Sequence, residues 1–255
     1  MSQIPGPVCR YLNLNHDYGT LLGCSRSVIP GPVGVKPPRA LDELTPIARW
    51  MVREMQQNAS GEHARRIHEL NNFNLETCVS ETRNWSWWQQ LFLGNSHIQH
   101  CAQQGLGAKA AAYMAWAFLV RQNGAWDHKP FIARTFTPAV TSGEQHYHRY
   151  HGHVYFYDIW SNIHYGYVGR ACGFSEAELL DGAGVEQIGS DLLRGTLPRS
   201  EEGVAGLRRF DPGEDRVAIE LGISLFNLPP GCLNAHQLVT RIVAQGHDLD
   251  RRIFP

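Results

Sequence analysis

The spacing of hydrophobic positions along the chain predicts helices. Between residues 45 and 58, apolar side chains recur at spacings of three and four, which is typical of one face of a helix. Thr45-Pro46 supplies an N-cap and a first-turn proline at the start of this segment. A second helix is expected over about residues 61–71. The apolar positions of the first helix are Ile47, Trp50, Met51 and Met55.

A run of small and apolar residues from Ala108 to Val120 predicts a further helix that stops at Asn123-Gly124. The run is apolar nearly all round, so we expect this helix to be buried at the centre of the domain. An aromatic cluster, Trp85-Ser86-Trp87-Trp88 with Leu91 and Phe92, precedes it. We interpret the cluster as core packing, and a stacking platform for sugars or bases is the alternative.

The pattern changes over Gln145–Tyr157, where alternating β-branched and aromatic residues predict a short β-hairpin with its turn at His151-Gly152. Helical signals then resume. A capping box at 175–178 predicts a helix toward Leu193. Two more helices are expected, one that Asp211-Pro212 opens with Asp211 as N-cap, and a last one that Asn234 caps and that runs through Gln245. The chain is therefore predicted to be an α+β, predominantly helical single domain with a short β-hairpin.

Residues 1–40 differ from the rest because they are rich in Gly and Pro, as in Pro5-Gly6-Pro7 and Pro37-Pro38. Such a stretch sustains neither long helices nor central strands, so we interpret 1–40 as an arm or linker before a catalytic domain over 41–255. The N-terminus lacks the positive start and apolar core of a signal peptide. The longest apolar stretch, Ala110–Val120, is too short for a membrane span, so we expect a soluble chain that another machine would have to export.

Composition narrows the function classes only slightly. The chain has 23 basic and 24 acidic residues and a net charge of −1. This balance argues against tight nonspecific binding of nucleic acid, although it leaves room for a local basic patch.

The six cysteines are scattered and form no C-x-x-C pair, which is poor evidence for a structural zinc site. We interpret them as small buried thiols. A disulfide between Cys9 and Cys24, or between Cys78 and Cys101, is the alternative if the protein works outside the cytosol.

Two segments gather polar side chains that could perform chemistry. Trp126–Pro130 places an acid, an imidazole and an amine on one turn, where side chains can converge on a ligand; a solvated turn is the alternative. In Tyr157–Arg170, a helix would place Asp158 and Asn162 on one face. Glycine destabilises a helix, so the glycines spaced three and four residues apart here need a reason, and close packing of another helix is the one we expect. These glycines are Gly166, Gly169 and Gly173.

A run of histidines, at 146, 148, 151 and 153, would pair imidazoles on the strands of the hairpin. A zinc site usually needs three ligands of fixed geometry, so we expect exposed histidines without a metal. The sequence also lacks a nucleophile elbow, a P-loop, an H-E-x-x-H motif and a deaminase signature. Hydrolysis by acid–base groups is therefore favoured over cofactor chemistry. We expect no cofactor, with a requirement for a divalent cation left open.

Several of these segments together resemble the ordered landmarks of the polymorphic toxin type 44 family. The matching segments are Trp126–Lys129, Tyr157–Gly169, Gly182–Gln187 and Asp211-Pro212 with Asp215, within a region from roughly Thr45 to Phe226. The resemblance implies a secreted antibacterial effector toxin, carried by a contact-dependent or type VI secretion system and neutralised by a cognate immunity protein. It also implies enzymatic activity, with ribonuclease activity as one suggestion. The family's polar landmarks fall on Asp127, Lys129, Asp158, Asn162 and His164.

Three functions follow from these residues. The favoured one is a hydrolase of the cell envelope, acting in the periplasm of the target on peptidoglycan or its lipid-linked precursor. In it Asp127 and Asp158 are the working carboxylates, and Lys129 and His164 hold a developing charge. The second is a metal-independent ribonuclease acting in the target cytoplasm, and the third is a non-catalytic module of a secretion apparatus. The residues expected to bind substrate are His128, Asn162, Tyr165, Arg170 and Asp211.

Overall fold

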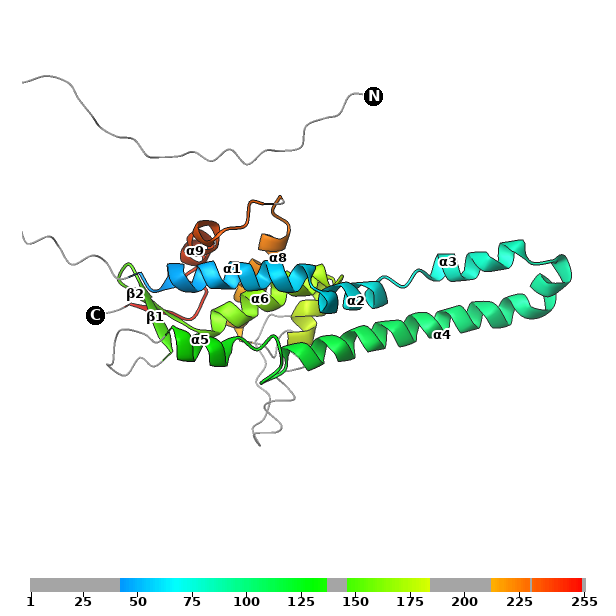
Figure 1. Ribbon diagram of the computed structural model, residues 1–255, viewed down its shortest axis with the longest axis horizontal. Helices are drawn as coiled ribbons and strands as arrows, with labels where there is room; N and C mark the ends of the chain where they lie inside the picture. Colours follow the sequence, from blue (N-terminus) through cyan, green and yellow to red (C-terminus); the bar gives the residue numbers. More distant parts are fainter. Residues whose placement is uncertain (1–41, 137–145, 184–211, 230, 254–255) are drawn as a thin grey trace, which may run out of the picture.

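The computed structural model describes residues 42–136, 146–183, 212–229 and 231–253 (Figure 1). Helices predominate in them, and the described strands form one three-stranded antiparallel sheet. The predicted α+β, mainly helical fold with a short hairpin is therefore confirmed. The expected arm over residues 1–40, with Cys9 and Cys24, lies outside the described residues, as does Asp211.

Two long helices, α6 (Asp158–Ala171) and α8 (Gly213–Phe226), pack against each other along their lengths. On one side they are covered by α1 (Leu44–Ser60) and α9 (Ala235–Ala244), which complete a core cluster that includes Met51, Trp160 and Leu238. On the other side lies a second cluster, formed with α2 (Glu62–Asn71), the last turns of α4 (Trp87–Val120) and a helix over residues 176–183.

Glycine permits the close contact between α6 and α8. A Cβ atom at Gly166 would overlap the carbonyl oxygen of Ile219, and one at Gly222 would overlap the carbonyl oxygen of Ile163. Each helix therefore packs its backbone directly on the other. A Cβ at Gly169 would overlap the side chain of Leu179, so the expectation of close packing is confirmed at Gly166 and Gly169. It is wrong at Gly173, which follows the end of α6 and has a positive φ of 84° that favours glycine.

Several predicted helix boundaries agree with the structure. The first helix differs, because it starts at Leu44, two residues before the predicted Pro46. Thr45 therefore lies inside the helix and is not its N-cap, and its N–H donates a hydrogen bond to the Asp42 carboxylate at 2.9 Å. Asn234 caps α9 as predicted, its side chain accepting from the Gln237 N–H.

The hairpin is formed by β1 (Tyr147–Tyr150) and β2 (His153–Phe156), paired so that Tyr150 faces His153. His151 and Gly152 connect the strands, and both have positive φ, at 46° and 78°. This conformation is typical of the tight two-residue turns of hairpins, and it confirms the predicted turn. The third strand, β3 (Arg251–Ile253), pairs with β2 and was not predicted, because three residues are too short for an alternating pattern.

The histidine run does not form a cluster. His146 precedes β1 and stacks on Tyr157, and His151 lies in the turn. His148 is buried, with its Nε2 atom 2.6 Å from the carbonyl oxygen of Phe136, so the expectation of exposed histidines is wrong at this position.

The prediction of a centrally buried helix over Ala108–Val120 is wrong. Helix α4 begins much earlier, at Trp87, and its first half projects from the domain (Figure 1). In its last turns Trp116 is buried, but Met114 and Phe118 on the other side are 74% and 61% exposed. The run is apolar all round although one side of the helix faces away from the domain.

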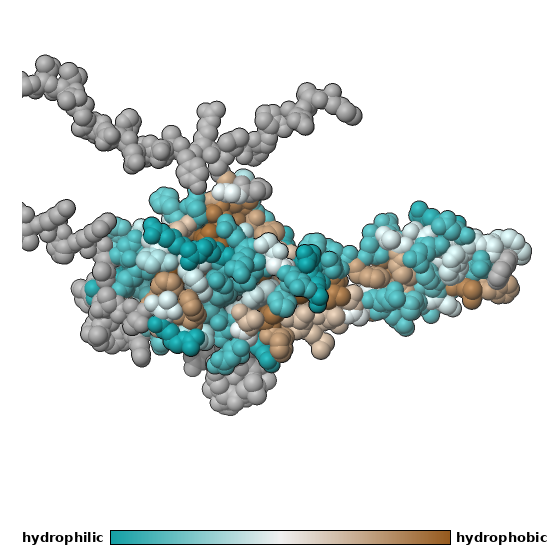
Figure 2. Space-filling view, in the orientation of Figure 1, coloured by the Kyte–Doolittle hydropathy of each residue, from teal (hydrophilic) through white to brown (hydrophobic). Residues whose placement is uncertain are grey.

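We call α3 (Leu75–Ser80), η1 (Glu81–Asn84) and residues 85–107 the hairpin arm. The interpretation of its tryptophan cluster as core packing is wrong for Trp87 and Phe92, which are 77% and 74% exposed. Brown hydrophobic surface is visible among teal hydrophilic surface along the arm (Figure 2). Within the described residues, no helix combines the length and the hydrophobicity needed to cross a membrane.

We predict that Gly166→Ala lowers the free energy of unfolding by about 1–3 kcal/mol, the usual range for overpacking, because the new methyl group must push α8 away. Gly107→Ala is the matched control, since it lies in α4 where an added Cβ meets nothing within 4 Å. It should stabilise the protein by up to about 1 kcal/mol through helix propensity. Urea unfolding of the two variants measures both values; equal effects would contradict the glycine contact described above.

Candidate functional site

A polar cavity of about 430 Å³ opens where the end of α4, the following turn, α5 (Lys129–Thr135) and α6 meet. It brings together five of the residues that the sequence singled out, from two separate segments of the chain, 127–129 and 162–165. They are Asp127, Lys129, Asn162, His164 and Tyr165, and the polar residues Gln122, Asn123, Tyr157 and Ser161 line the cavity with them.

Asp127 organises the turn that enters the cavity. One of its carboxylate oxygens accepts a hydrogen bond from the N–H of Asn123 at 2.8 Å, and the other accepts one from the N–H of Lys129 at 3.2 Å. Asn123 has a positive φ of 61°, which the turn requires. Asp127 therefore fixes the start of α5 and the position of Lys129.

Two polar pairs lie beside the cavity. The ammonium group of Lys129 is 2.7 Å from a carboxylate oxygen of Asp158. One helical turn along α6, the amide nitrogen of Asn162 donates a hydrogen bond to a carboxyl oxygen of Asp215 at 2.7 Å. Asp215 is contributed by the first turn of α8, so the close packing of α6 on α8 brings the two acids together.

Asp215 is the functional candidate that sequence reasoning missed, since it was noted only as a landmark after Asp211-Pro212. An acidic residue in the first turn of a helix is explained by the helix dipole, so there was no reason in the sequence to assign Asp215 a chemical role. Burial, and next the negative charge of Asp158, raise the pKa of Asp215 to about 7, although Lys129 and Asn162 oppose the shift. Asp158 and Asp215 also line a small cavity of about 120 Å³ together with Glu214 and Asp250.

His128 and His164 are buried side by side, with ring centroids 4.1 Å apart. Burial lowers the pKa of His128 to about 4, although the charge of Asp127 opposes the shift. Burial, and next the charge of His128, lower the pKa of His164 as well. Both rings are therefore neutral at pH 7.

Helix α1 supplies two partners of these histidines that the sequence did not reveal. The Nε2 atom of His164 is 3.0 Å from the side-chain nitrogen of Asn58, so the ring accepts a hydrogen bond there. The Nε2 atom of His128 is 3.7 Å from a carboxylate oxygen of Glu54. Both lie on the side of an amphipathic helix next to its apolar stripe, where polar residues are common.

Arg170 is not brought to the cavity. It lies in the last turn of α6 and donates a hydrogen bond to the carbonyl oxygen of Phe174 at 2.6 Å. It therefore holds the loop after α6. His128, also expected to bind substrate, is 5% exposed, and its neighbours Asp127 and Lys129 line the cavity.

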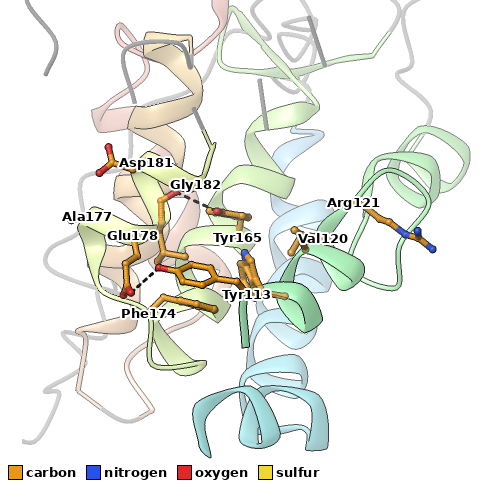
Figure 3. A pocket seen from close by; sticks show the side chains of 12 residues that line it. Tyr113, Val120, Arg121, Tyr165, Phe174, Ala177, Glu178, Asp181 and Gly182 are labelled. Carbon is orange, nitrogen blue, oxygen red and sulfur yellow. Dashed lines mark hydrogen bonds between the residues drawn. The ribbon is translucent and has the colours of Figure 1, made fainter. Parts of the chain in front are cut away.

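A second cavity, of about 610 Å³ and mainly apolar, adjoins the polar one (Figure 3). Tyr113, Trp116 and Phe174 line it, and the hydroxyl of Tyr113 donates a hydrogen bond to Glu178 at 2.8 Å. Val120 and Tyr165 line both cavities and so form their common wall. A ligand in the polar cavity therefore has an apolar surface within reach.

In the part of the chain that the structure describes, one group of side chains has ligand atoms close enough together for a single metal ion. It consists of Cys78, His97 and Cys101 and lies on the hairpin arm, away from the polar cavity.

We predict that the difference in the free energy of unfolding between the wild type and Asp215→Asn falls as the pH rises from 4 to 7. The unfolded chain loses the Asp215 proton near its ordinary pKa of 3.8, while the folded chain keeps it up to about pH 7. The contribution of Asp215 is therefore present below pH 4 and is lost as the pH rises to 7, by on the order of 4 kcal/mol.

Urea unfolding at pH 4.5 and pH 7 measures this contribution as the difference between the two proteins. The buried His128 acts in the opposite direction, because the unfolded chain binds its proton first as the pH falls. That effect is common to both proteins and cancels. A difference that does not change with pH would show that Asp215 titrates normally.

Residues 115–227 match the model of a protein family described as bacterial toxin 44. The match spans both segments that form the polar cavity, and it confirms the resemblance drawn from the sequence. No curated protein and no solved structure gave a match. The match supports a bacterial toxin role, and a toxin of this family implies a cognate immunity protein.

Proposed function

We propose that this bacterial toxin 44 domain is a hydrolase of the bacterial cell envelope, which cleaves the glycosidic bond between the sugars of peptidoglycan or of its lipid-linked precursor. The observation that carries the proposal is the carboxyl pair Asp158 and Asp215. Asp158 is ion-paired with Lys129, while the pKa of Asp215 is about 7. Two carboxyl groups whose environments separate their pKa values are the usual acid and base of glycan cleavage.

In this mechanism protonated Asp215 donates its proton to the glycosidic oxygen as the bond breaks. The Asp158 carboxylate stabilises the positive charge that develops on the sugar ring or activates the attacking water. Lys129 is ion-paired with Asp158 at 2.7 Å, and Asn162 orients Asp215 through its 2.7 Å hydrogen bond. Asp127 is assigned a positioning role instead, because both its oxygens accept backbone hydrogen bonds.

The electrostatics of the cavity disfavour the ribonuclease alternative. Metal-independent cleavage of RNA by histidines needs one neutral and one protonated ring near neutral pH. The pKa of His128 is about 4 and that of His164 is also lowered, so neither ring supplies the acid. Of the described residues that line the polar cavity, Lys129 is the one lysine or arginine, and its ammonium group is already ion-paired with Asp158. The cavity therefore offers little positive charge for an RNA phosphate.

Cys78 and Cys101 form a disulfide and Cys232 is disulfide-bonded, so the interpretation of the cysteines as buried thiols is wrong for these three and holds for Cys172. The disulfide between Cys78 and Cys101 supports a target outside the cytoplasm. Disulfides persist in oxidising compartments such as the periplasm and are rare in the cytosol. We therefore propose that a dedicated secretion system and its carrier deliver the toxin to the periplasm of a target bacterium, where a cognate immunity protein protects sibling cells.

We predict that the chain kills bacteria when it is directed to their periplasm and not when it stays in their cytoplasm. Asp158→Asn and Asp215→Asn should each abolish killing, because each removes one group of the acid–base pair. Glu220→Gln is the matched control, an exposed acid on α8 that should leave killing unchanged. Colony counts after induced expression measure the effect.

Two further results would decide between the alternatives. Killing from the cytoplasm with degraded RNA would establish the ribonuclease, and harmlessness in both compartments would favour a non-catalytic module. A Cys78→Ser, Cys101→Ser double variant separates target location from folding. If it still kills from the periplasm, the harmlessness of the cytoplasmic chain does not come from the missing disulfide between Cys78 and Cys101; a Cys232→Ser variant tests the disulfide of Cys232 in the same way.

We also predict that the purified chain releases new reducing sugar ends from peptidoglycan sacculi, and that the rate falls as the pH rises through about 7. The fall follows from the loss of the Asp215 proton. Lys129→Met should move this limb to higher pH, because the ammonium group lowers the pKa of Asp215. Release of new amino groups without reducing ends would identify a peptidase or amidase and contradict the assignment.

A further inference from the structure

The hairpin arm has little hydrophobic core to hold its two sides together. Helix α3 contains no buried residue, and the side chains of Leu91 and Phe92 on the facing part of the arm are exposed. Cys101 is the exception, since it is fully buried against α3. Small structures of this kind usually depend on a disulfide or a metal ion.

A histidine lies beside the disulfide of the arm. The Nε2 atom of His97 is 3.4 Å from the sulfur of Cys101 and 2.9 Å from the carbonyl oxygen of Cys78. The ligand atoms of Cys78, His97 and Cys101 all lie within 4.8 Å of one another. His97 and Cys101 are one helical turn apart, so the backbone of α4 holds both on the side that faces α3.

We propose that Cys78, His97 and Cys101 form a binding site for a thiophilic divalent cation such as Zn²⁺, which is occupied when the disulfide is reduced. Two thiolates and one imidazole are typical ligands of tetrahedral zinc, with Zn–S of about 2.3 Å and Zn–N of about 2.0 Å. The carboxylate of Glu81 is 4.0 Å from His97 Nε2 but does not belong to the group of ligand atoms within 4.8 Å of one another, so a water molecule or a rotated Glu81 side chain would supply the fourth ligand. The ring of Trp85 packs on His97, with centroids 5.0 Å apart, and shields one side of the site.

The disulfide and the metal site exclude each other. A dithiol reductant transfers two electrons and two protons to the disulfide, which yields the thiols of Cys78 and Cys101 and leaves the reductant oxidised. The cation then displaces the two thiol protons. His97 gives up its hydrogen bond to the Cys78 carbonyl oxygen and binds through a deprotonated Nε2.

The two states suit two compartments. In a reducing cytosol, where the disulfide does not form, the metal ion would hold α3 on α4. In an oxidising compartment the disulfide would replace it. The arm would then keep one shape on both sides of a membrane, and this inference does not depend on the reaction proposed for Asp158 and Asp215.

Anaerobic titration of the reduced full chain with Co²⁺ tests the proposal. We expect one cobalt ion per chain, with the thiolate charge-transfer and ligand-field absorption of a tetrahedral site, displaced by an equivalent of Zn²⁺. Cys101→Ser should abolish this absorption, and His97→Ala should weaken cobalt binding at least tenfold. His100→Ala is the matched control, an exposed histidine next to Cys101.

Reduction also opens the disulfide of Cys232, so Cys232→Ser is a second control that should keep the absorption. Absence of the bands in the reduced wild type, or bands of equal strength in Cys101→Ser, would overturn the proposal. The oxidised wild type should bind no cobalt. Because the comparison of oxidised and reduced wild type needs no substitution, it tests the proposal even if a variant fails to fold.

Discussion

The close contact between α6 and α8 is the constraint on which the candidate site depends. Gly166 and Gly222 let each helix rest on the carbonyl groups of the other, so the distance between the helix axes is set by backbone atoms. Asn162 and Asp215 lie about one turn from this contact, and their 2.7 Å hydrogen bond requires it. A backbone contact is stiffer than one between flexible side chains, and it keeps Asp158 and Asp215 near each other.

Burial gives the site its chemical character. The same loss of water that keeps His128 and His164 neutral keeps Asp215 protonated to about pH 7, because burial disfavours the charged form of either kind of group. The Lys129–Asp158 ion pair lies at a more exposed position, with 40% and 22% of the two side chains accessible. The site therefore contains a neutral interior and a charged edge, and a substrate would meet the charged pair first.

Periodicity and capping predicted much of this arrangement. The face that Asp158 and Asn162 share, the turn at His151-Gly152 and the cap at Asn234 follow from local rules, and the structure confirms them. Asp215 could not be found in this way, because its raised pKa arises from packing between elements far apart in the chain. The exposed side of α4 could not be predicted for a similar reason: an apolar run indicates burial, and no local signal reveals that a helix leaves the domain.

Helix α4 also determines how the molecule behaves in solution. A straight helix of 34 residues is about 51 Å long, slightly more than the diameter of about 46 Å of a sphere with the radius of gyration expected for a compact chain of 255 residues, about 18 Å. Because the first half of α4 projects from the domain, it makes the molecule elongated (Figure 1). An elongated particle has a larger frictional coefficient than a sphere of the same mass. The monomer will therefore sediment slowly and elute early from a sizing column. An apparent mass calibrated against spherical standards will exceed 28.7 kDa without any self-association. Light scattering, which measures mass independently of shape, is the appropriate way to count its subunits.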